Sequence, residues 1–274
     1  MTIKKFKNLF CAVFYMARRS VTKVKSLRLS MSKSGSSFIC AICGHKSGYE
    51  IVEREGMPCD WCGSTWRARA MVLALLQALG KPNVVLSQVN EDWSIRGIGI
   101  SDDMKIASKL GGKFSYVNTY YHQRPKLDLC AVDEQWVQSS RFVICSDVLE
   151  HVPAPAETAL RGLHSILQPG GVAVISVPYK PEGVTEEFYP DLERYKVVDD
   201  DVVWYDNSGT RHIDSNPEFH GGAGQTLAFR LWSLPGLIDA LSSSGFSYVS
   251  VMKCDEKLGV PSLGLGDSVV LAYK

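Results

Sequence analysis

The stretch 142-FVICSDVLEHVPAPAETALRGLHSILQPGGVAVISVPY-179 decides the fold. The stretch at 141–148, which is apolar at 142–145, predicts a buried strand. Apolar residues then recur at helical spacing over 154–167. The Pro-Gly-Gly sequence at 169–171 ends that helix, and an apolar run at 172–177 predicts the next buried strand. A strand, a helix and a strand in this order predict a parallel βαβ unit.

The same alternation continues on both sides of this unit. Upstream, strands are predicted at 84–89, 95–100 and 114–120, and helices at 65–79 and 102–110, the second capped by Ser101 or Asp102. Downstream, a helix is predicted at 231–244 and strands at 246–253 and 268–273. The pattern predicts an α/β protein with a doubly wound, mostly parallel, seven-stranded sheet whose last two strands pair antiparallel. Ligands of such sheets bind beyond the carboxyl ends of the strands.

Residues 178–225 differ in composition from the predicted core. They contain Pro178, Pro181 and Pro190 and an acidic run at 199–201, and 206-DNSG-209 predicts a hairpin turn. We interpret this segment as an insertion that folds over the carboxyl edge of the sheet. The chain then divides into an arm and linker at 1–37, a cysteine module with its helix at 38–80, and an α/β domain at 81–274.

Four of the eight cysteines form two C-x2-C pairs that are separated by 15 residues. This is the spacing of a zinc ribbon with two knuckles, and a glycine follows each pair where a knuckle needs positive φ. The predicted ligands of a structural Zn²⁺ are Cys40, Cys43, Cys59 and Cys62. His45 could replace one cysteine, and four buried or redox-active thiols are the alternative interpretation. The other cysteines are scattered among apolar residues, which favours a reducing, cytoplasmic location.

Three groups of residues resemble class I S-adenosylmethionine (SAM)-dependent methyltransferases, which have a Rossmann-like sheet. The element D-V-L-E-H-V at 147–152 and L-x-P-G-G at 167–171 are typical of the fourth strand, the following helix and the fifth strand. The stretch 96–107 is similar to the second strand and its helix. The four-cysteine module, N-T-Y-Y-H-x-x-P-x-L-D at 118–128 and F-H-G-G-x-G-x-T-L at 219–227 are similar to one group of these enzymes. The resemblance implies that 81–274 is a SAM-dependent methyltransferase domain.

The resemblance also implies where SAM lies, with two departures. No glycine-rich loop follows the first predicted strand, so Ser87 and Gln88 would replace it near the methionine end, together with Ser146 and Asp147. Gly99 stands where the acid for the ribose is expected, and Asp102 is the nearest substitute. The expected cofactor residues are Ser87, Gln88, Gly97, Gly99, Ser101, Asp102, Asn118, Thr119, Ser146 and Asp147, with adenine near Asn118 and Thr119.

Three residues are candidates for proton removal from an acceptor. His220 is the first candidate for a general base, because an imidazole titrates near neutral pH and glycines follow it. His122 and Asp147 are the others, although a histidine in a glycine loop can simply cap or pack, and Asp147 can instead bind the SAM amino group. Glu150 and His151 are interpreted as structural or supporting residues.

Charge is concentrated at the N-terminus. Residues 1–39 hold nine Lys and Arg and no acid, which leaves 21 basic against 29 acidic residues, or −8, for the remainder. A body of this charge makes nucleic-acid binding unlikely. Apolar residues at helical spacing in the arm predict a peripheral contact with anionic membranes, with a disordered tail or a transit peptide as alternatives.

The sequence therefore predicts a methyltransferase that acts on a small-molecule or glycan acceptor, by O- or N-methylation. Two other classes of function stay open. One is a methyltransferase-fold binding protein that has lost catalysis, and the other is a nucleic-acid methyltransferase targeted by the zinc ribbon. Neither the acceptor nor the oligomeric state follows from the sequence.

Overall fold

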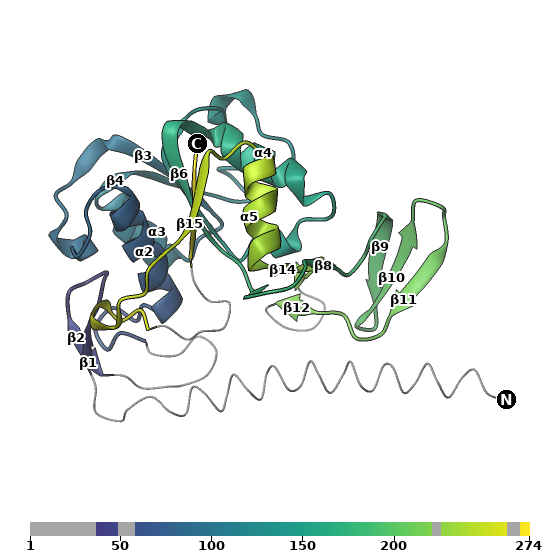
Figure 1. Cartoon of the computed structure of the whole chain (residues 1–274), viewed down its shortest axis with the longest axis horizontal. Coiled ribbons are helices and arrows are strands. Elements are labelled where there is room, and N and C mark those ends of the chain that lie inside the picture. The colour runs from purple at the N-terminus through teal and green to yellow at the C-terminus, as the bar shows by residue number, and fades with distance from the viewer. Residues whose placement is uncertain (1–36, 49–57, 221–225, 262–268) are drawn as a thin grey trace.

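A computed structural model of the chain describes residues 37–48, 58–220, 226–261 and 269–274 (Figure 1). The membrane-binding prediction for the arm concerns residues 1–29, which lie outside the described part. Among the described residues, none of the helices combines the length and apolar character that a membrane span requires.

The core of the molecule is a six-stranded sheet with the order β15-β16-β6-β5-β3-β4. Four of these strands run parallel to one another: β3 (Asp92–Ile100), β4 (Phe114–Thr119), β5 (Ser140–Ser146) and β6 (Leu167–Ser176). β16 (Val270–Tyr273) is antiparallel to β6, and β15 (Tyr248–Val251) is antiparallel to β16. The predictions of an α/β class, a mostly parallel sheet and an antiparallel final pair are confirmed.

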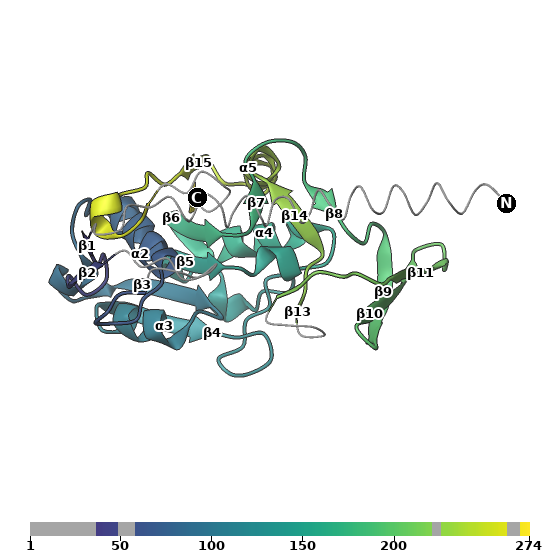
Figure 2. The same ribbon diagram turned by 90° about the horizontal axis from the view of Figure 1, so that it is seen from below.

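Helices cover both faces of the sheet, as Figures 1 and 2 show. Phe142 and Ile144 of β5 point into one core with α2 (Trp66–Ala78) and α3 (Met104–Gly111). Val143 and Cys145 point into the other, with α4 (Ala156–Ile166) and α5 (Leu234–Ser243). A parallel strand covered on both sides is apolar along its buried part, which explains the apolar run at 142–145 that identified β5.

The prediction of seven strands is wrong, because 84–89 forms no strand. It contains a single 3-10 turn, η1 (Leu86–Gln88), whose backbone is bonded to the first cysteine loop. Leu86 N and Ser87 N donate to the carbonyls of Ala41 and Ile42, at 2.9 Å each. Leu86 and Val89 are buried in the core that this loop shares with α2. The apolar run was therefore correctly identified as buried, but it packs against the cysteine module and not beside another strand.

The cysteine module and the sheet share one apolar core. The module contributes the small hairpin of β1 (Ser37–Ile39) and β2 (Lys46–Gly48), and its residues Phe38, Cys40, Ala41 and Ile42 pack in the same cluster as Phe142 and Val174. Near the C-terminus, η4 (Glu256–Leu258) closes over the module, where Arg69 Nε donates to Gly259 O at 2.9 Å. The module is thus part of the wall of the α/β domain.

The segment after β6 forms three small groups of strands. β14 (Arg230–Ser233) pairs with β7 (Tyr179–Lys180) and β8 (Glu186–Glu187), and β12 (Phe219–His220) pairs with β13 (Thr226–Leu227). The third group is the sheet of β9 (Leu192–Val198), β10 (Asp201–Asp206) and β11 (Arg211–Asp214). The hairpin predicted at 206–209 is confirmed between β10 and β11, and Asp199 and Asp200, both at positive φ, turn β9 into β10.

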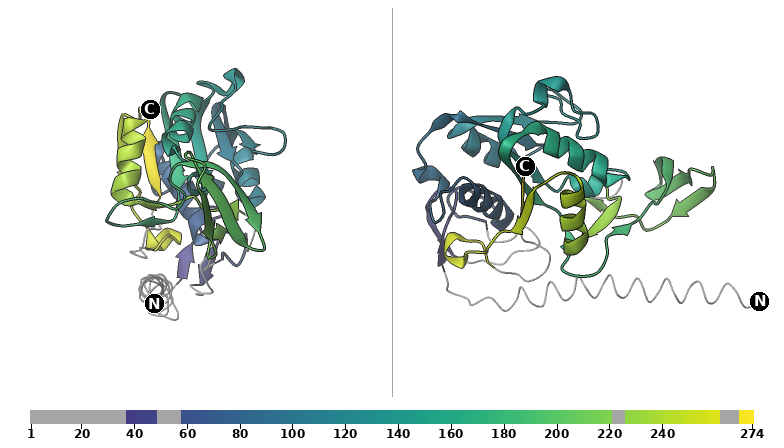
Figure 3. Two further views of the ribbon diagram at one scale, coloured as in Figure 1. Left: turned by 90° about the vertical axis from the view of Figure 1, so that its right-hand side faces the viewer. Right: turned by 45° about the horizontal axis from the view of Figure 1, so that its top comes forward.

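The sheet of β9, β10 and β11 does not fold over the carboxyl edge of the central sheet, as the sequence had suggested for this insertion. It projects outward past β8 and β14 in Figures 1 and 2 and in the right panel of Figure 3. Its root is an aromatic cluster in which Tyr189 and Phe229 flank Trp204 and Val202. The end of the described segment, at β12, approaches the turn after β5, where His220 contacts His151 of η3 (Leu149–His151).

Several helix boundaries follow from caps that are visible in the sequence. Thr65 caps α2 by accepting from Ala68 N, and Ser233 caps α5 by accepting from Gly236 N. The cap of α3 is Asp103 and not Ser101 or Asp102, because its side chain accepts from Lys105 N at 2.7 Å. This shift of one residue leaves the side chain of Asp102 available for the sheet edge. A further 3-10 turn, η2 (Glu134–Trp136), precedes β5.

Gly97 leaves the space that the ring of Phe142 occupies. A Cβ at this position would lie 2.1 to 2.6 Å from three ring atoms, and Tyr116 stacks on Phe142 at 5.8 Å. We therefore expect Gly97→Ala to lower the free energy of unfolding by about 1–3 kcal/mol, as overpacking does. Urea unfolding measures this. Gly111→Ala is the control, since an added Cβ there meets no atom within 4 Å. Equal stabilities of the two variants would contradict the packing.

Candidate functional site

The four paired cysteines converge in the structure. Cys40 Sγ lies 3.7 Å from Cys62 Sγ, and Cys43 Sγ lies 3.6 Å from Cys59 Sγ. All four sulfur atoms lie within 4.8 Å of one another. Four thiolates on one Zn²⁺, with bonds of about 2.3 Å, would lie about 3.8 Å apart at the corners of a tetrahedron. The cluster fits one tetrahedral metal ion.

Two tight backbone turns produce this convergence. Gly44 N donates to Cys40 O at 2.9 Å and Gly63 N donates to Cys59 O at 2.8 Å, and both glycines have positive φ, as the spacing predicted. His45 is not part of the sulfur cluster, because its ring stacks on Trp61 at 5.2 Å. Ser47 and Ser64 instead place hydroxyls beside Cys59 and Cys40, at 3.4 and 3.3 Å from the sulfurs.

The second cysteine turn leads directly into α2. Arg69, which is fully buried, donates from Nη1 to Ser64 O at 2.5 Å and lies 4.3 Å from the centre of the Phe38 ring. These contacts fix the start of α2 against the module. As a result, Arg67 in the first turn of the helix faces the carboxyl edge of the sheet.

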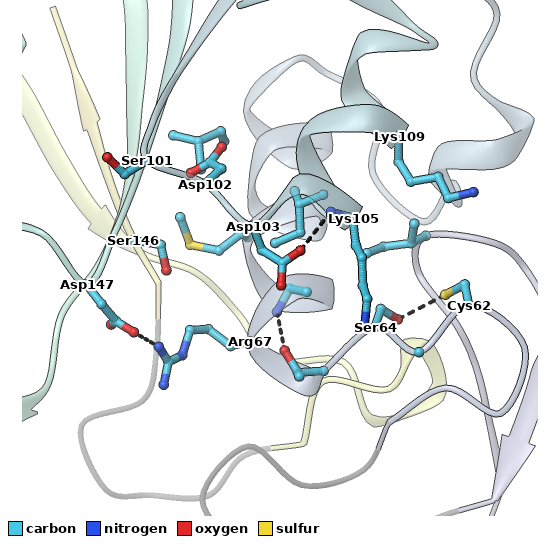
Figure 4. A pocket seen from close by; sticks show the side chains of 17 residues that line it. Cys62, Ser64, Arg67, Ser101, Asp102, Asp103, Lys105, Lys109, Ser146 and Asp147 are labelled. Carbon is cyan, nitrogen blue, oxygen red and sulfur yellow. Dashed lines mark hydrogen bonds and ion pairs between the residues drawn. The ribbon is translucent and has the colours of Figure 1, made fainter. Parts of the chain in front are cut away.

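A cavity of about 250 Å³ lies between the module and the carboxyl ends of β3 and β5 (Figure 4). Four of the predicted cofactor residues line it: Ser101, Asp102, Ser146 and Asp147. The opposite wall comes from the cysteine module, α2 and α3, through Cys62, Ser64, Thr65, Arg67, Met71, Lys105 and Lys109. The sheet side of the cavity therefore carries Asp102 and Asp147, while the helix side carries Arg67, Lys105 and Lys109 together with Asp103, the cap of α3.

An ion pair crosses this cavity. Arg67 Nη1 binds Asp147 Oδ2, and both side chains are partly exposed, at 20% and 29% (Figure 4). Asp147 follows the last residue of β5 at a φ of 53°, and its amide donates to Ser176 O at 2.8 Å. Ser146 is held beside Ser176 by a hydroxyl contact of 2.8 Å. The strand end thus aims the carboxylate at α2. Arg67 was not among the predicted site residues, although it stands directly after a cysteine turn.

Asp102 occupies the space of the side chain that Gly99 lacks. A Cβ on Gly99 would lie 2.6 Å from Asp102 Oδ2 and 2.3 Å from the hydroxyl of Tyr116. The Tyr116 hydroxyl donates to this carboxylate. Burial raises the pKa of Asp102 to about 7, although the bond from Tyr116 acts in the opposite direction. The same burial, with the neighbouring Asp102, raises the pKa of Tyr116 well above its usual value. Tyr116 was not among the site residues predicted from the sequence.

Asn118 and Thr119 are engaged by the backbone. The Asn118 amide accepts from Asp102 N at 3.0 Å and donates to Asp102 O at 2.9 Å. Thr119 is fully buried and donates to Gly99 O at 2.7 Å. Both residues hold the turn after β3 in place, and neither lines the cavity. Their predicted contact with adenine stays a prediction.

The remaining predicted cofactor residues lie away from the cavity. Ser87 and Gln88 are exposed in η1, which is bonded to the cysteine module. Gly97 and Gly99 serve packing, the first against Phe142 and the second against Asp102. The structure thus brings together only the polar residues at the ends of β3 and β5.

The candidate histidines lie in different places. His122 is exposed on the loop after β4, against the ring of Tyr121. His220 Nδ1 lies 2.9 Å from His151 Nε2 and 3.5 Å from Glu150 Oε1. Glu150 is 1% exposed. His220 therefore belongs to a cluster with Glu150 and His151, the two residues that were interpreted from the sequence as structural or supporting.

Comparisons with known proteins give a likeness of structure alone. No family model matches the chain, and no curated protein matches it. A 1,6-didemethyltoxoflavin-N1-methyltransferase from Burkholderia thailandensis is 14% identical, with a TM-score of 0.44 over 76% of this chain and 78% of that one. An amino pentose methyltransferase from Micromonospora echinaspora is 13% identical, with a TM-score of 0.42 over 77% and 92%. A SAM-dependent methyltransferase from Clostridium acetobutylicum is 10% identical, with a TM-score of 0.44 over 74% and 90%. With TM-scores this low, the description of the fold rests on the strand order given above.

We expect purified protein to contain one equivalent of zinc per chain in the four-cysteine cluster. Cys59→Ser should lose this zinc and unfold at lower urea concentration, because the cysteine module shares its core with the sheet. Elemental analysis and urea unfolding measure the two effects. Cys130→Ser, an exposed cysteine outside the cluster, is the control. Metal-free wild type, or full zinc content in Cys59→Ser, would contradict the site.

The pKa of Asp102 predicts a dependence of stability on pH. The folded state keeps the proton up to about pH 7, whereas the unfolded chain loses it near 3.8, the usual value. Stability contributed by the protonated form is therefore lost as the pH rises from 4 to 7, by up to about 1.4 kcal/mol per pH unit. Asp102→Asn lacks this titration, so its free energy of unfolding relative to wild type should increase between pH 4 and 7. A constant difference across that range would contradict the raised pKa of Asp102.

Proposed function

We propose that this chain is a SAM-dependent methyltransferase that transfers a methyl group to a small-molecule or glycan acceptor. The observation that carries the proposal is the position of Asp102 at the carboxyl end of β3. Its carboxylate fills the place of a side chain on Gly99, where the methyltransferase resemblance implies an acid for the ribose hydroxyls. The carboxyl group of Asp102 loses its proton near pH 7, and above that pH the carboxylate only accepts hydrogen bonds, which suits a pair of hydroxyl donors.

The ion pair between Arg67 and Asp147 supports the same assignment. The methionine end of SAM carries an ammonium and a carboxylate, and these match Asp147 and Arg67 respectively. A zwitterion that enters between the two side chains gives each charge a new partner, so opening the pair does not leave an unpaired ion. Arg67 and Asp147 are partly exposed, so their mutual attraction is modest and easily exchanged for ligand contacts.

In this proposal SAM supplies the activated methyl group, and the protein residues bind and orient the reactants. The general-base role of His220 stays a prediction, and the hydrogen bonds give it a specific form. His151 Nδ1 lies 2.8 Å from Leu227 O, and since a carbonyl only accepts, Nδ1 donates. His151 Nε2 then accepts from His220 Nδ1, so in this form Nε2, which lies 3.7 Å from Glu218 Oε1, would be the atom of His220 that takes a proton from the acceptor.

A binding protein without catalysis is the second candidate. The segment at 84–89 forms no strand and carries no glycine-rich loop, so the backbone that would approach the methionine moiety is missing there. The cysteine module supplies the opposite wall of the cavity in its place. We also propose that Zn²⁺ in the module is structural, since four thiolates leave no open coordination position.

Asp147→Ala should weaken SAM binding by about tenfold or more, as loss of a charge-assisted hydrogen bond of about 1.5–3 kcal/mol predicts. Arg67→Ala should weaken it by a similar factor through loss of the carboxylate partner. Isothermal titration with SAM and with S-adenosylhomocysteine measures both. Asp239→Ala, an exposed acid on the opposite face in α5, is the control. If wild type binds neither ligand, the proposed function is wrong; if the variants bind as well as wild type, the two residues are not in the site.

A further inference from the structure

We propose that Glu150, His151 and His220 bind a divalent first-row transition-metal ion, at a site distinct from the four cysteines. Glu150 and His151 lie in η3, which follows β5, and His220 lies in β12. One ligand atom from each, Glu150 Oε1, His151 Nε2 and His220 Nδ1, converges on one point from two segments about 70 residues apart.

The separations of these atoms fit one ion. His151 Nε2 lies 2.9 Å from His220 Nδ1, and Glu150 Oε1 lies 3.5 Å from His220 Nδ1 and 3.8 Å from His151 Nε2. Nitrogen and oxygen ligands about 2.0–2.2 Å from a metal lie about 3.0–3.4 Å apart in octahedral or tetrahedral geometry. Movements of a few tenths of an ångström therefore complete the coordination.

Glu150 provides an independent indication of a ligand. Its side chain is 2% exposed, and among the described residues neither carboxylate oxygen has a hydrogen-bond partner. A buried carboxylate without partners is costly, because water no longer solvates the charge. The Arg230 guanidinium makes its hydrogen bonds elsewhere: Nε donates to Glu187 at 2.7 Å and Nη1 donates to the carbonyls of Leu149 and Val152. A cation beside Oε1 removes this cost.

The hydrogen bonds around the histidines also suit a metal. The bond from His151 Nδ1 to Leu227 O leaves the lone pair of His151 on Nε2, the atom that faces Glu150 and His220. A bond from the second ring nitrogen to a carbonyl or carboxylate orients most metal-binding histidines in this way. On the other ring, His220 Nε2 lies 3.7 Å from Glu218 Oε1. When Nε2 of His220 carries the proton of the neutral ring, the lone pair is on Nδ1, which can then bind the ion.

Two imidazoles and one carboxylate favour ions such as Zn²⁺, Fe²⁺, Co²⁺ or Mn²⁺ and leave coordination positions open. The chemical consequence rests on the proposed function. A hydroxyl of the acceptor bound at an open position would lose its proton to water more readily, as metal-bound water does. The oxygen then forms a bond to the methyl carbon while the carbon–sulfur bond of SAM breaks and S-adenosylhomocysteine leaves. This role favours O-methylation and replaces the general-base role of His220.

A titration with Co²⁺ tests the site. The full chain, with zinc in its cysteine cluster, is titrated with Co²⁺ and followed by visible absorption and by elemental analysis after gel filtration. We expect one equivalent of Co²⁺ without sulfur-to-cobalt charge-transfer absorption, which would identify cobalt bound to cysteine. Glu150→Gln and His220→Ala should each weaken Co²⁺ binding by at least about 10–100-fold, since loss of even an outer-shell partner costs this much.

His212→Ala is the matched control, because His212 also pairs with a carboxylate, Asp206, at 2.8 Å, but forms no group of three possible ligands within the described part of the chain. Glu150→Gln keeps the shape of a buried side chain, and the His220 side chain is 19% exposed, so one of the variants remains informative if the other fails to fold. No cobalt beyond the zinc, or unchanged binding in both variants, overturns the proposal. SAM affinity measured on the same samples separates this result from the proposed function, which fails only if SAM does not bind.

Discussion

The backbone hydrogen bonds from Leu86 and Ser87 to the carbonyls of Ala41 and Ile42 fix the arrangement on which the candidate site depends. They bind the segment before β3 to the first cysteine turn, so the module sits against the sheet and shares its core. α2 starts from the second cysteine turn and is held there by the buried Arg69. Without this docking, Arg67 would not reach Asp147, and the cavity would lack its second wall.

The charges around the cavity follow from this arrangement. Strand ends supply Asp102 and Asp147, while α2 and α3 supply Arg67, Lys105 and Lys109. Opposite charges on facing walls suit a ligand that is itself zwitterionic. Asp102 stands apart from the other acid, because burial and the adjoining Tyr116 determine its protonation, whereas Asp147 is partly exposed and ion-paired. Two carboxylates at the same sheet edge thus have different chemistry.

The small strands after β6 divide into two parts with different relations to the site. The sheet of β9, β10 and β11 projects away from the body and is anchored by aromatic packing around Trp204. β12 instead returns to η3 and places His220 beside His151 and the buried Glu150. The end of the insertion therefore contacts the segment that follows β5, where Glu150 lies three residues beyond Asp147.

The sequence by itself determined the features that depend on neighbouring residues. The apolar run of β5, the positive φ of Gly44 and Gly63 and the hairpin at 206–209 all follow from local chemistry. The Pro-Gly-Gly sequence at 169–171 does not end the helix, because α4 stops at Ile166 and these residues lie within β6. It also placed Ser101, Asp102, Ser146 and Asp147 at strand ends, and these residues do line the cavity. Only the tertiary structure decided whether 84–89 became a strand, which carboxylate filled the space beside Gly99, and which residues faced Asp147 and Glu150. Those outcomes depend on contacts between residues far apart in the chain, such as Ser87 with Ile42 and His220 with His151, and local spacing carries no information about which distant groups meet.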